Sequence, residues 1–223
     1  MTKPYRLSVE LFIQHFREQG IAIAAVELEL HRKILYCSAL DPLARAVSGQ
    51  SGTHRSRLVH LLTNHTAWPD AQRVSLFQLM LHLQAKKRTR FRLYREARRR
   101  LNLSTPRRRL PLSISPLHAE IATFAALQEE KILRYYTYAD LFYTYRNNLI
   151  HEYSEPGYGT DWSRKAPEPF YTNLSSFGSR ELVFPLTFVA GLYEQALGSV
   201  ERHFMQQKIN PHSRFEFGSH WHS

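Results

Sequence analysis

One segment, residues 86–110, carries the whole excess of positive charge of this 223-residue chain. It holds twelve of the thirty Lys and Arg residues but only one of the nineteen acidic residues, Glu96. Phe91, Tyr94, Ala97 and Leu101 recur at spacings of three and four, which predicts a helix with one apolar face and one arginine face. Like charges repel at helical spacing, so this face strongly limits how the segment can be packed.

The arginine face has two interpretations. A dense basic patch is typical of proteins that bind a polyanion, because contact with phosphates releases condensed counterions. Arginine outnumbers lysine here, and arginine suits bidentate phosphate contacts and stacking on bases. The alternative is a solvated surface or a contact with another protein. The arginines predicted to bind RNA are Arg88, Arg90, Arg92, Arg95, Arg98, Arg99, Arg100, Arg107, Arg108 and Arg109.

Composition indicates a folded globular protein, since 43% of the residues are hydrophobic and 13% are aromatic. No apolar run approaches the roughly 18 residues that a membrane-spanning helix needs, so no membrane association is expected. Residues 1–20 lack the pattern of a signal peptide. The single cysteine, Cys37, lies among apolar residues and is interpreted as a buried, inert thiol. Together these features predict a cytoplasmic protein.

The apolar spacing predicts a chain of helices within one domain, 1–223, without repeats or a low-complexity linker. Gly20 is expected to divide 8–36 into a short N-terminal helical extension (1–20) and a longer helix, and Asp41-Pro42 to break or kink the chain. Further helices are expected at about 55–62, 71–85 (with Asp70 as N-cap), 86–101, 115–133, 137–153 and 181–207. Residues 155–180 are expected to form a long loop or a small hairpin, and 208–223 a tail.

The helix ending near Tyr153 carries a chemically suggestive pattern. Arg146 is followed directly by Asn147, and His151 comes five positions after the arginine. An imidazole can exchange a proton near neutral pH, and a guanidinium can hold the charge that builds on a phosphate under attack. A second pair with the same spacing, Arg55 and His60, lacks the amide and is interpreted as chance.

This pattern resembles the motif of the HEPN superfamily of ribonucleases, in which Arg and a polar residue precede His. The His151-Glu152-Tyr153 continuation is similar to the version found in HEPN toxins. The resemblance implies an all-α, antiparallel HEPN-like bundle and a metal-independent endoribonuclease without a cofactor, active in phage defence or in growth arrest. It implies that His151 is the general base or acid and that Arg146 binds the scissile phosphate. Asn147 would orient His151 or the phosphate by hydrogen bonding.

The resemblance to the HEPN superfamily also predicts binding partners. One histidine does not easily perform both proton transfers, so we expect a homodimer in which two copies line one cleft. In the toxins an antitoxin or a nucleotidyltransferase is a partner, and the equivalent of Tyr153 is the residue that receives the nucleotide. Glu152 is expected either to pair with a cation across the dimer or to be solvated.

Other interpretations remain open. A HEPN-like module could bind or sense RNA through 86–110 without cleaving it, and the chain could also be an unrelated helical interaction protein. His212, His220 and His222 near the C-terminus have no carboxylate or cysteine at ligand spacing, so no metal site is expected.

Overall fold

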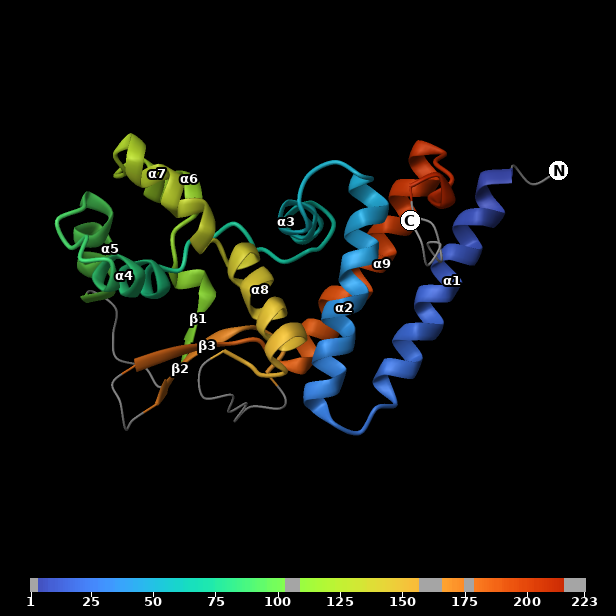
Figure 1. Cartoon of the computed structure of the whole chain (residues 1–223), viewed down its shortest axis with the longest axis horizontal. Coiled ribbons are helices and arrows are strands. Elements are labelled where there is room, and N and C mark those ends of the chain that lie inside the picture. The colour runs from blue at the N-terminus through green and yellow to red at the C-terminus, as the bar shows by residue number, and fades with distance from the viewer. Residues whose placement is uncertain (1–3, 103–108, 157–165, 175–178, 215–223) are drawn as a thin grey trace. The chain divides into compact units, whose positions relative to one another are not determined.

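The computed structural model describes residues 4–102, 109–156, 166–174 and 179–214. These residues form nine α-helices and one small sheet (Figure 1). The chain divides into two compact units, each of which is described by itself. Unit 1 consists of Met1–Trp68, Arg146–Pro156 and Val189–Ser223, and unit 2 of Pro69–Tyr145 and Gly157–Phe188. One domain over 1–223 stays a prediction.

Unit 1 is built from long helices. They are α1 (Pro4–Ala24), α2 (Glu29–Ser48), α3 (His54–Asn64) and most of α9 (Leu186–Gln207), followed by a 3-10 turn, Pro211–Ser213. Val9, Phe12, Ile13 and Phe16 put a buried stripe on α1, and the ring of Phe12 meets the ring of Phe204 on α9 edge-on at 5.7 Å. Apolar residues at helical spacing therefore hold α1 against α9, as hydrophobic burial requires.

The break predicted at Gly20 in unit 1 is wrong. Helix α1 continues through Gly20, where an added Cβ would lie 3.0 Å from the ring of Tyr193, so this glycine permits a close approach and does not end the helix. Of the break or kink predicted at Asp41-Pro42, the break is excluded, because α2 continues through Pro42. Leu40 and Leu43 on either side of the proline are fully buried, and their burial offsets the missing hydrogen bond. The predicted helix at 55–62 is confirmed as α3.

Unit 2 combines short helices with a sheet. Its helices are α4 (Leu76–Ala85), α5 (Arg92–Asn102), α6 (His118–Ala122), α7 (Leu127–Leu133) and most of α8 (Tyr138–Asn147). The strands β1 (Arg109–Pro111), β2 (Phe170–Leu174) and β3 (Ser179–Val183) pair antiparallel in the order β1-β2-β3, with Tyr171 opposite both Leu110 and Leu182. The helical class is confirmed, and the small sheet is an addition to the predicted helices. The pairing of β2 with β3 confirms the hairpin before the last helix.

Several boundaries in unit 2 differ from the prediction. Helix α4 begins at Leu76 with Ser75 as N-cap, because Arg73 and Val74 form bridges in an extended conformation and Asp70 pairs with Arg73 at 2.8 Å. The 86–101 helix begins only at Arg92, after a turn in which Lys87 has a positive φ of 56°. The predicted helix at 115–133 is divided into α6 and α7, and residues 181–183 belong to β3.

The motif helix begins and ends as predicted. The Thr137 hydroxyl accepts a hydrogen bond from the backbone N–H of Asp140 at 3.3 Å and donates to its carboxylate at 3.0 Å. After Asn147 the helix widens into one π turn, Asn148–Glu152, and Tyr153 ends it in the left-handed region with a φ of 52°. Whether the helices are arranged as in a HEPN bundle stays a prediction.

Candidate nucleic-acid interface and motif turn

Helix α5 is held in unit 2 by a narrow buried stripe. Leu93 and Ala97 are fully buried in a cluster that includes Leu79 and Leu83 of α4. The first turn of α5 is capped from another helix, because the buried carboxylate of Glu129 accepts the backbone N–H groups of Arg92 at 3.1 Å and Leu93 at 3.2 Å. An acidic group at this end also compensates for the arginines there, since the helix dipole disfavours positive charge at an N-terminus.

The remaining surface of α5 and the turn before it is the arginine face. We define it as the exposed Arg88, Arg90, Arg92, Arg95, Arg98 and Arg99 together with the half-buried Arg100. Arg107 and Arg108 lie outside the described residues. Arg109 begins β1, and its side chain is not among those described. The predicted helix with one apolar and one arginine face is thus confirmed for α5.

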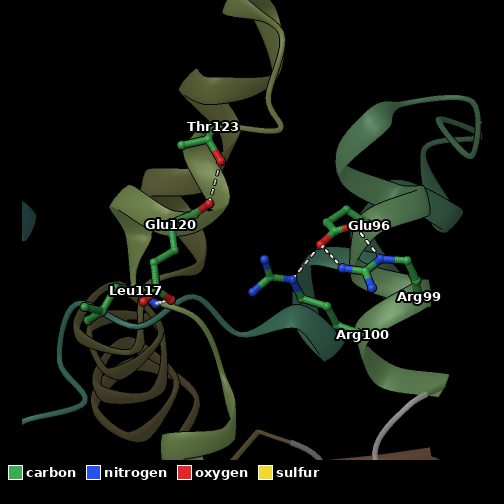
Figure 2. Close-up of polar contacts among 6 residues, drawn as sticks. All are labelled: Glu96, Arg99, Arg100, Leu117, Glu120 and Thr123. Carbon is green, nitrogen blue, oxygen red and sulfur yellow. Dashed lines mark hydrogen bonds and ion pairs between the residues drawn. The ribbon is translucent and has the colours of Figure 1, made fainter.

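Glu96 organises two of these arginines. Its carboxylate accepts two hydrogen bonds from Arg99, at 2.7 and 2.8 Å, and one from Arg100 at 2.7 Å (Figure 2). These bonds, with that of Arg99 the largest contribution, lower the pKa of Glu96 to about 2, although its burial acts in the opposite direction. One buried carboxylate therefore fixes the directions of two guanidinium groups.

A hollow of about 350 Å³ lies beside this cluster. It is lined by Arg92, Arg95, Glu96, Arg99, Thr123 and Phe124. Phe124 comes from the turn between α6 and α7, and the guanidinium of Arg100 lies 5.5 Å from the centre of its ring. Figure 2 shows Thr123 on the α6 side, where its hydroxyl donates to the carbonyl of Glu120 at 2.8 Å. The guanidinium groups of this hollow can bind an anion, and its aromatic ring can stack on a planar group attached to that anion.

In unit 1 the motif turn, which we define as Arg146–Glu155, contacts one face of α2. Leu149 is fully buried and anchors the π turn. Four residues of α2 recur at intervals of four, Glu29, Lys33, Cys37 and Asp41, and so share one side of the helix. Two of them pair with the motif turn: Lys33 with Glu155, and Asp41 with Arg146.

Arg146 is engaged within its own chain. It forms an ion pair with Asp41 and donates a hydrogen bond to the side-chain oxygen of Asn147 at 2.8 Å. Only 13% of its side chain is exposed, and burial lowers its pKa from the ordinary value. The guanidinium keeps its charge nonetheless, because arginine is not deprotonated in proteins. The structure therefore brings Arg146 and Asn147 together, as part of a local ion-pair network.

The second pair of this network is more deeply buried. Lys33 is completely buried, and its ammonium group lies 3.0 Å from the carboxylate of Glu155 and 3.9 Å from that of Glu29. Cys37 lies between the two pairs in sequence, and burial raises the pKa of its thiol to about 12. The predicted buried thiol is confirmed. Sequence reasoning missed Lys33, Asp41 and Glu155, although the charged spacing of four on 29–41 is visible in the sequence.

His151 and Glu152 project from the motif turn as exposed residues. Within the described part of the chain, no hydrogen bond joins His151 to Arg146. Tyr153 is 58% exposed, and its hydroxyl is hydrogen bonded to the ring of His31 on α2. The catalytic roles of Arg146, Asn147 and His151 stay predictions, as do the homodimer and the modification of Tyr153.

A metal site has no support in the described ranges, where no group of three or more His, Cys, Asp or Glu side chains is placed to hold an ion. His220 and His222 lie outside those ranges. None of the helices described has both the length and the apolar content needed to cross a bilayer. Comparisons with protein-family models, with curated proteins and with solved structures found no match to this chain.

Proposed function

We propose that this protein binds RNA through the arginine face of α5. The observation that carries the proposal is that the seven arginines of the arginine face, six of them exposed, surround a single acidic residue of α5, Glu96, which Arg99 and Arg100 already neutralise in part. Arg92, Arg95 and Arg98 are exposed, and among the described residues the ion pairs of Glu96 are with Arg99 and Arg100. Phosphates would supply the missing negative charge and release counterions, whereas an equally basic surface in water repels itself.

The fixed geometry of Glu96, Arg99 and Arg100 supports RNA binding over a merely solvated surface. Long arginine side chains lose rotamer freedom when they bind, and this loss opposes affinity. Glu96 holds Arg99 and Arg100 in fixed directions before any ligand arrives. Part of the ordering has therefore taken place in the free protein, which is what a preorganised anion site requires.

A charge-matched pair of triple variants tests the proposal. Replacement of Arg92, Arg95 and Arg98 by Gln removes three charges from the arginine face, and replacement of Arg6, Arg202 and Lys208 by Gln removes three exposed charges elsewhere. Fluorescence anisotropy with a labelled RNA, over a series of salt concentrations, gives affinity and salt dependence. For a single strand we expect the plot of log K against log salt to become shallower by about 2 in the first variant, because each lost phosphate contact removes about 0.7 from the magnitude of the slope.

The control triple should keep most of the affinity and nearly the full slope. Equal losses in both triples would show that only net charge matters, and would overturn the assignment of the site to α5. Absence of RNA binding by the wild type at low salt would overturn the proposed function itself.

A second candidate function is a metal-independent ribonuclease of HEPN type, working as a homodimer in defence or growth arrest. Two observations favour it: His151 is exposed, and it lies on a π turn, a feature that is frequent at functional sites. Arg146 would have to exchange Asp41 for a phosphate in order to take part, because its charge is already paired.

Cleavage assays separate this candidate from binding alone. With EDTA present, wild-type protein should cut RNA and leave cyclic phosphate ends, whereas His151→Ala should be inactive and still bind. His54→Ala is the matched control, since His54 is also exposed, on α3. RNA that stays intact with wild-type protein, or equal cleavage by His151→Ala, would reject the ribonuclease and leave the binding function standing.

A further inference from the structure

The hollow beside α5 has one wall that is not basic. Phe124, in the turn between α6 and α7, is 41% exposed, so its ring is accessible to a ligand. Arg100 lies over its ring, and Glu96 holds that guanidinium in place with a hydrogen bond of 2.7 Å. The ring is therefore supported by a cation that cannot turn away freely, while a large part of its surface remains open.

The size and chemistry of the hollow limit what can occupy it. A volume of about 350 Å³ lies near the lower end of the range for small-ligand sites, roughly 300–1,000 Å³. Arg92 and Arg95 line it with exposed guanidinium groups, which are suited to phosphate. The Thr123 hydroxyl donates to Glu120, so its lone pairs remain able to accept a hydrogen bond from an N–H group.

We propose that this hollow receives one unpaired nucleobase, stacked on Phe124, while Arg92 and Arg95 hold the adjoining phosphates. The proposal rests on the RNA-binding function above and makes single-stranded RNA the preferred ligand. In a duplex the bases are stacked inside, and the deep major groove of A-form RNA does not admit side chains. An aromatic platform beside a basic surface is the arrangement that binds single strands with little sequence preference, since every base has a π face.

Phe124→Leu tests the stacking step, because leucine keeps an apolar side chain but removes the ring. Tyr135→Leu is a closely matched control: Tyr135 is 40% exposed in unit 2 and carries Arg134 over its ring at 4.7 Å, but does not line the hollow. Phe124→Trp keeps an aromatic surface and serves as the conservative variant. Binding is measured with a short single strand carrying a fluorescent base analogue and with a duplex of equal length.

We expect Phe124→Leu to weaken single-strand binding by about 5- to 150-fold, the loss typical of one stacked base, and to change duplex binding little. Phe124→Trp and Tyr135→Leu should bind the single strand like the wild type, and the base analogue should lose fluorescence on binding to every protein except Phe124→Leu. Unchanged single-strand affinity in Phe124→Leu, or equal losses for single strand and duplex, would overturn the stacking site.

Failure of this proposal is distinguishable from failure of the proposed function. If the triple arginine variant loses RNA and Phe124→Leu does not, the arginine face binds RNA without a base in the hollow. If the wild type binds neither RNA, both proposals are overturned. A Phe124→Leu protein that unfolds is replaced in the test by Phe124→Trp with the base analogue, where a lack of fluorescence change on binding overturns stacking.

Discussion

The arginine face and the motif turn use the same side chain in opposite ways. Arg92 and Arg95 are exposed on α5 and line a hollow, whereas Arg146 is largely buried and paired with Asp41. What differs is the supply of acids. Glu96 is the only acidic residue of segment 86–110. One side of α2, in contrast, carries Glu29 near Lys33 and Asp41 beside Arg146. An arginine is available to an external anion where the fold does not already pair it with an acidic side chain.

The two regions also differ in what a lost partner costs. Removing ions from water carries a penalty of several kcal/mol each, which a buried pair offsets only while both partners are present. Exposed charges keep most of their hydration, and their mutual interactions are worth about 0–1 kcal/mol. Substitutions in the motif turn should therefore act on stability, and substitutions on the arginine face on binding.

The largest effect is expected at the buried end of the motif turn. Lys33→Met replaces a completely buried ammonium group by a neutral side chain of similar length and removes the cation that lies 3.0 Å from the carboxylate of Glu155. We expect a loss of about 3–5 kcal/mol in the free energy of unfolding, measured by urea denaturation. The exposed Lys131→Met should change it by less than about 0.5 kcal/mol.

The double variant Lys33→Met, Glu155→Gln removes both charges and should recover a large part of the loss, as neutral replacements of buried pairs often do. Were Lys33→Met as stable as the wild type, the contrast between the two regions would fail, because the buried pair would then contribute nothing.

A smaller effect, dependent on pH, is expected at Glu96. Its pKa is about 2 in the folded protein, below the ordinary value of 4.5, so its ionised form stabilises the fold above about pH 4.5. That contribution decreases as the pH falls from about 4.5 towards 2. Because Arg99 is more than half exposed and water screens the pair, we expect Glu96→Gln to cost only about 1–2 kcal/mol at pH 7.

Urea denaturation of wild type and Glu96→Gln at several pH values checks this expectation. The difference between the two proteins should be constant above pH 5 and should shrink in acid. A difference that grows as the pH falls would show that Glu96 is not held ionised by Arg99 and Arg100.

The smallest effect on stability is expected on the arginine face itself. Arg95→Gln should change the free energy of unfolding by less than about 0.5 kcal/mol, because the side chain is exposed. Its RNA affinity should nevertheless fall, with a decrease of about 0.7 in the salt slope for a single strand. A clear loss of stability without a change in affinity would reverse the roles assigned to the two regions.

Local patterns predicted much of the fold where they agreed with the tertiary structure. The stripe of α5 and the Thr137 cap of α8 depend on residues three and four apart, so the sequence contains them directly. The helices continue through Gly20, where a break was expected, and through Pro42, where a break or a kink was expected. Packing decided both: Tyr193 needs the space at Gly20, and Leu40 and Leu43 are buried around Pro42. The third strand of the sheet, β1, was missed because it pairs with β2 across about sixty positions of the chain, as Leu110 and Tyr171 do.

The candidate sites divide in the same way. The arginine face could be predicted because charge composition needs no knowledge of contacts. The partner of Arg146 could not, since Asp41 lies 105 positions earlier in the chain and was interpreted only as the residue before a proline. Phe124 was overlooked for a similar reason: nothing in its local sequence indicates that α6 and α7 bring it to the arginines of α5.

The cap that Glu129 places on α5 has a consequence for fragments of this protein. A peptide spanning 86–110 alone would lack that carboxylate and the apolar surface of α4, while keeping all the repulsion among its arginines. It would be an unfolded polycation in water, able to associate with nucleic acid by charge but without the hollow. The selectivity proposed for this surface is thus a property of the assembled helices α4 to α7, and excising the basic stretch would abolish it.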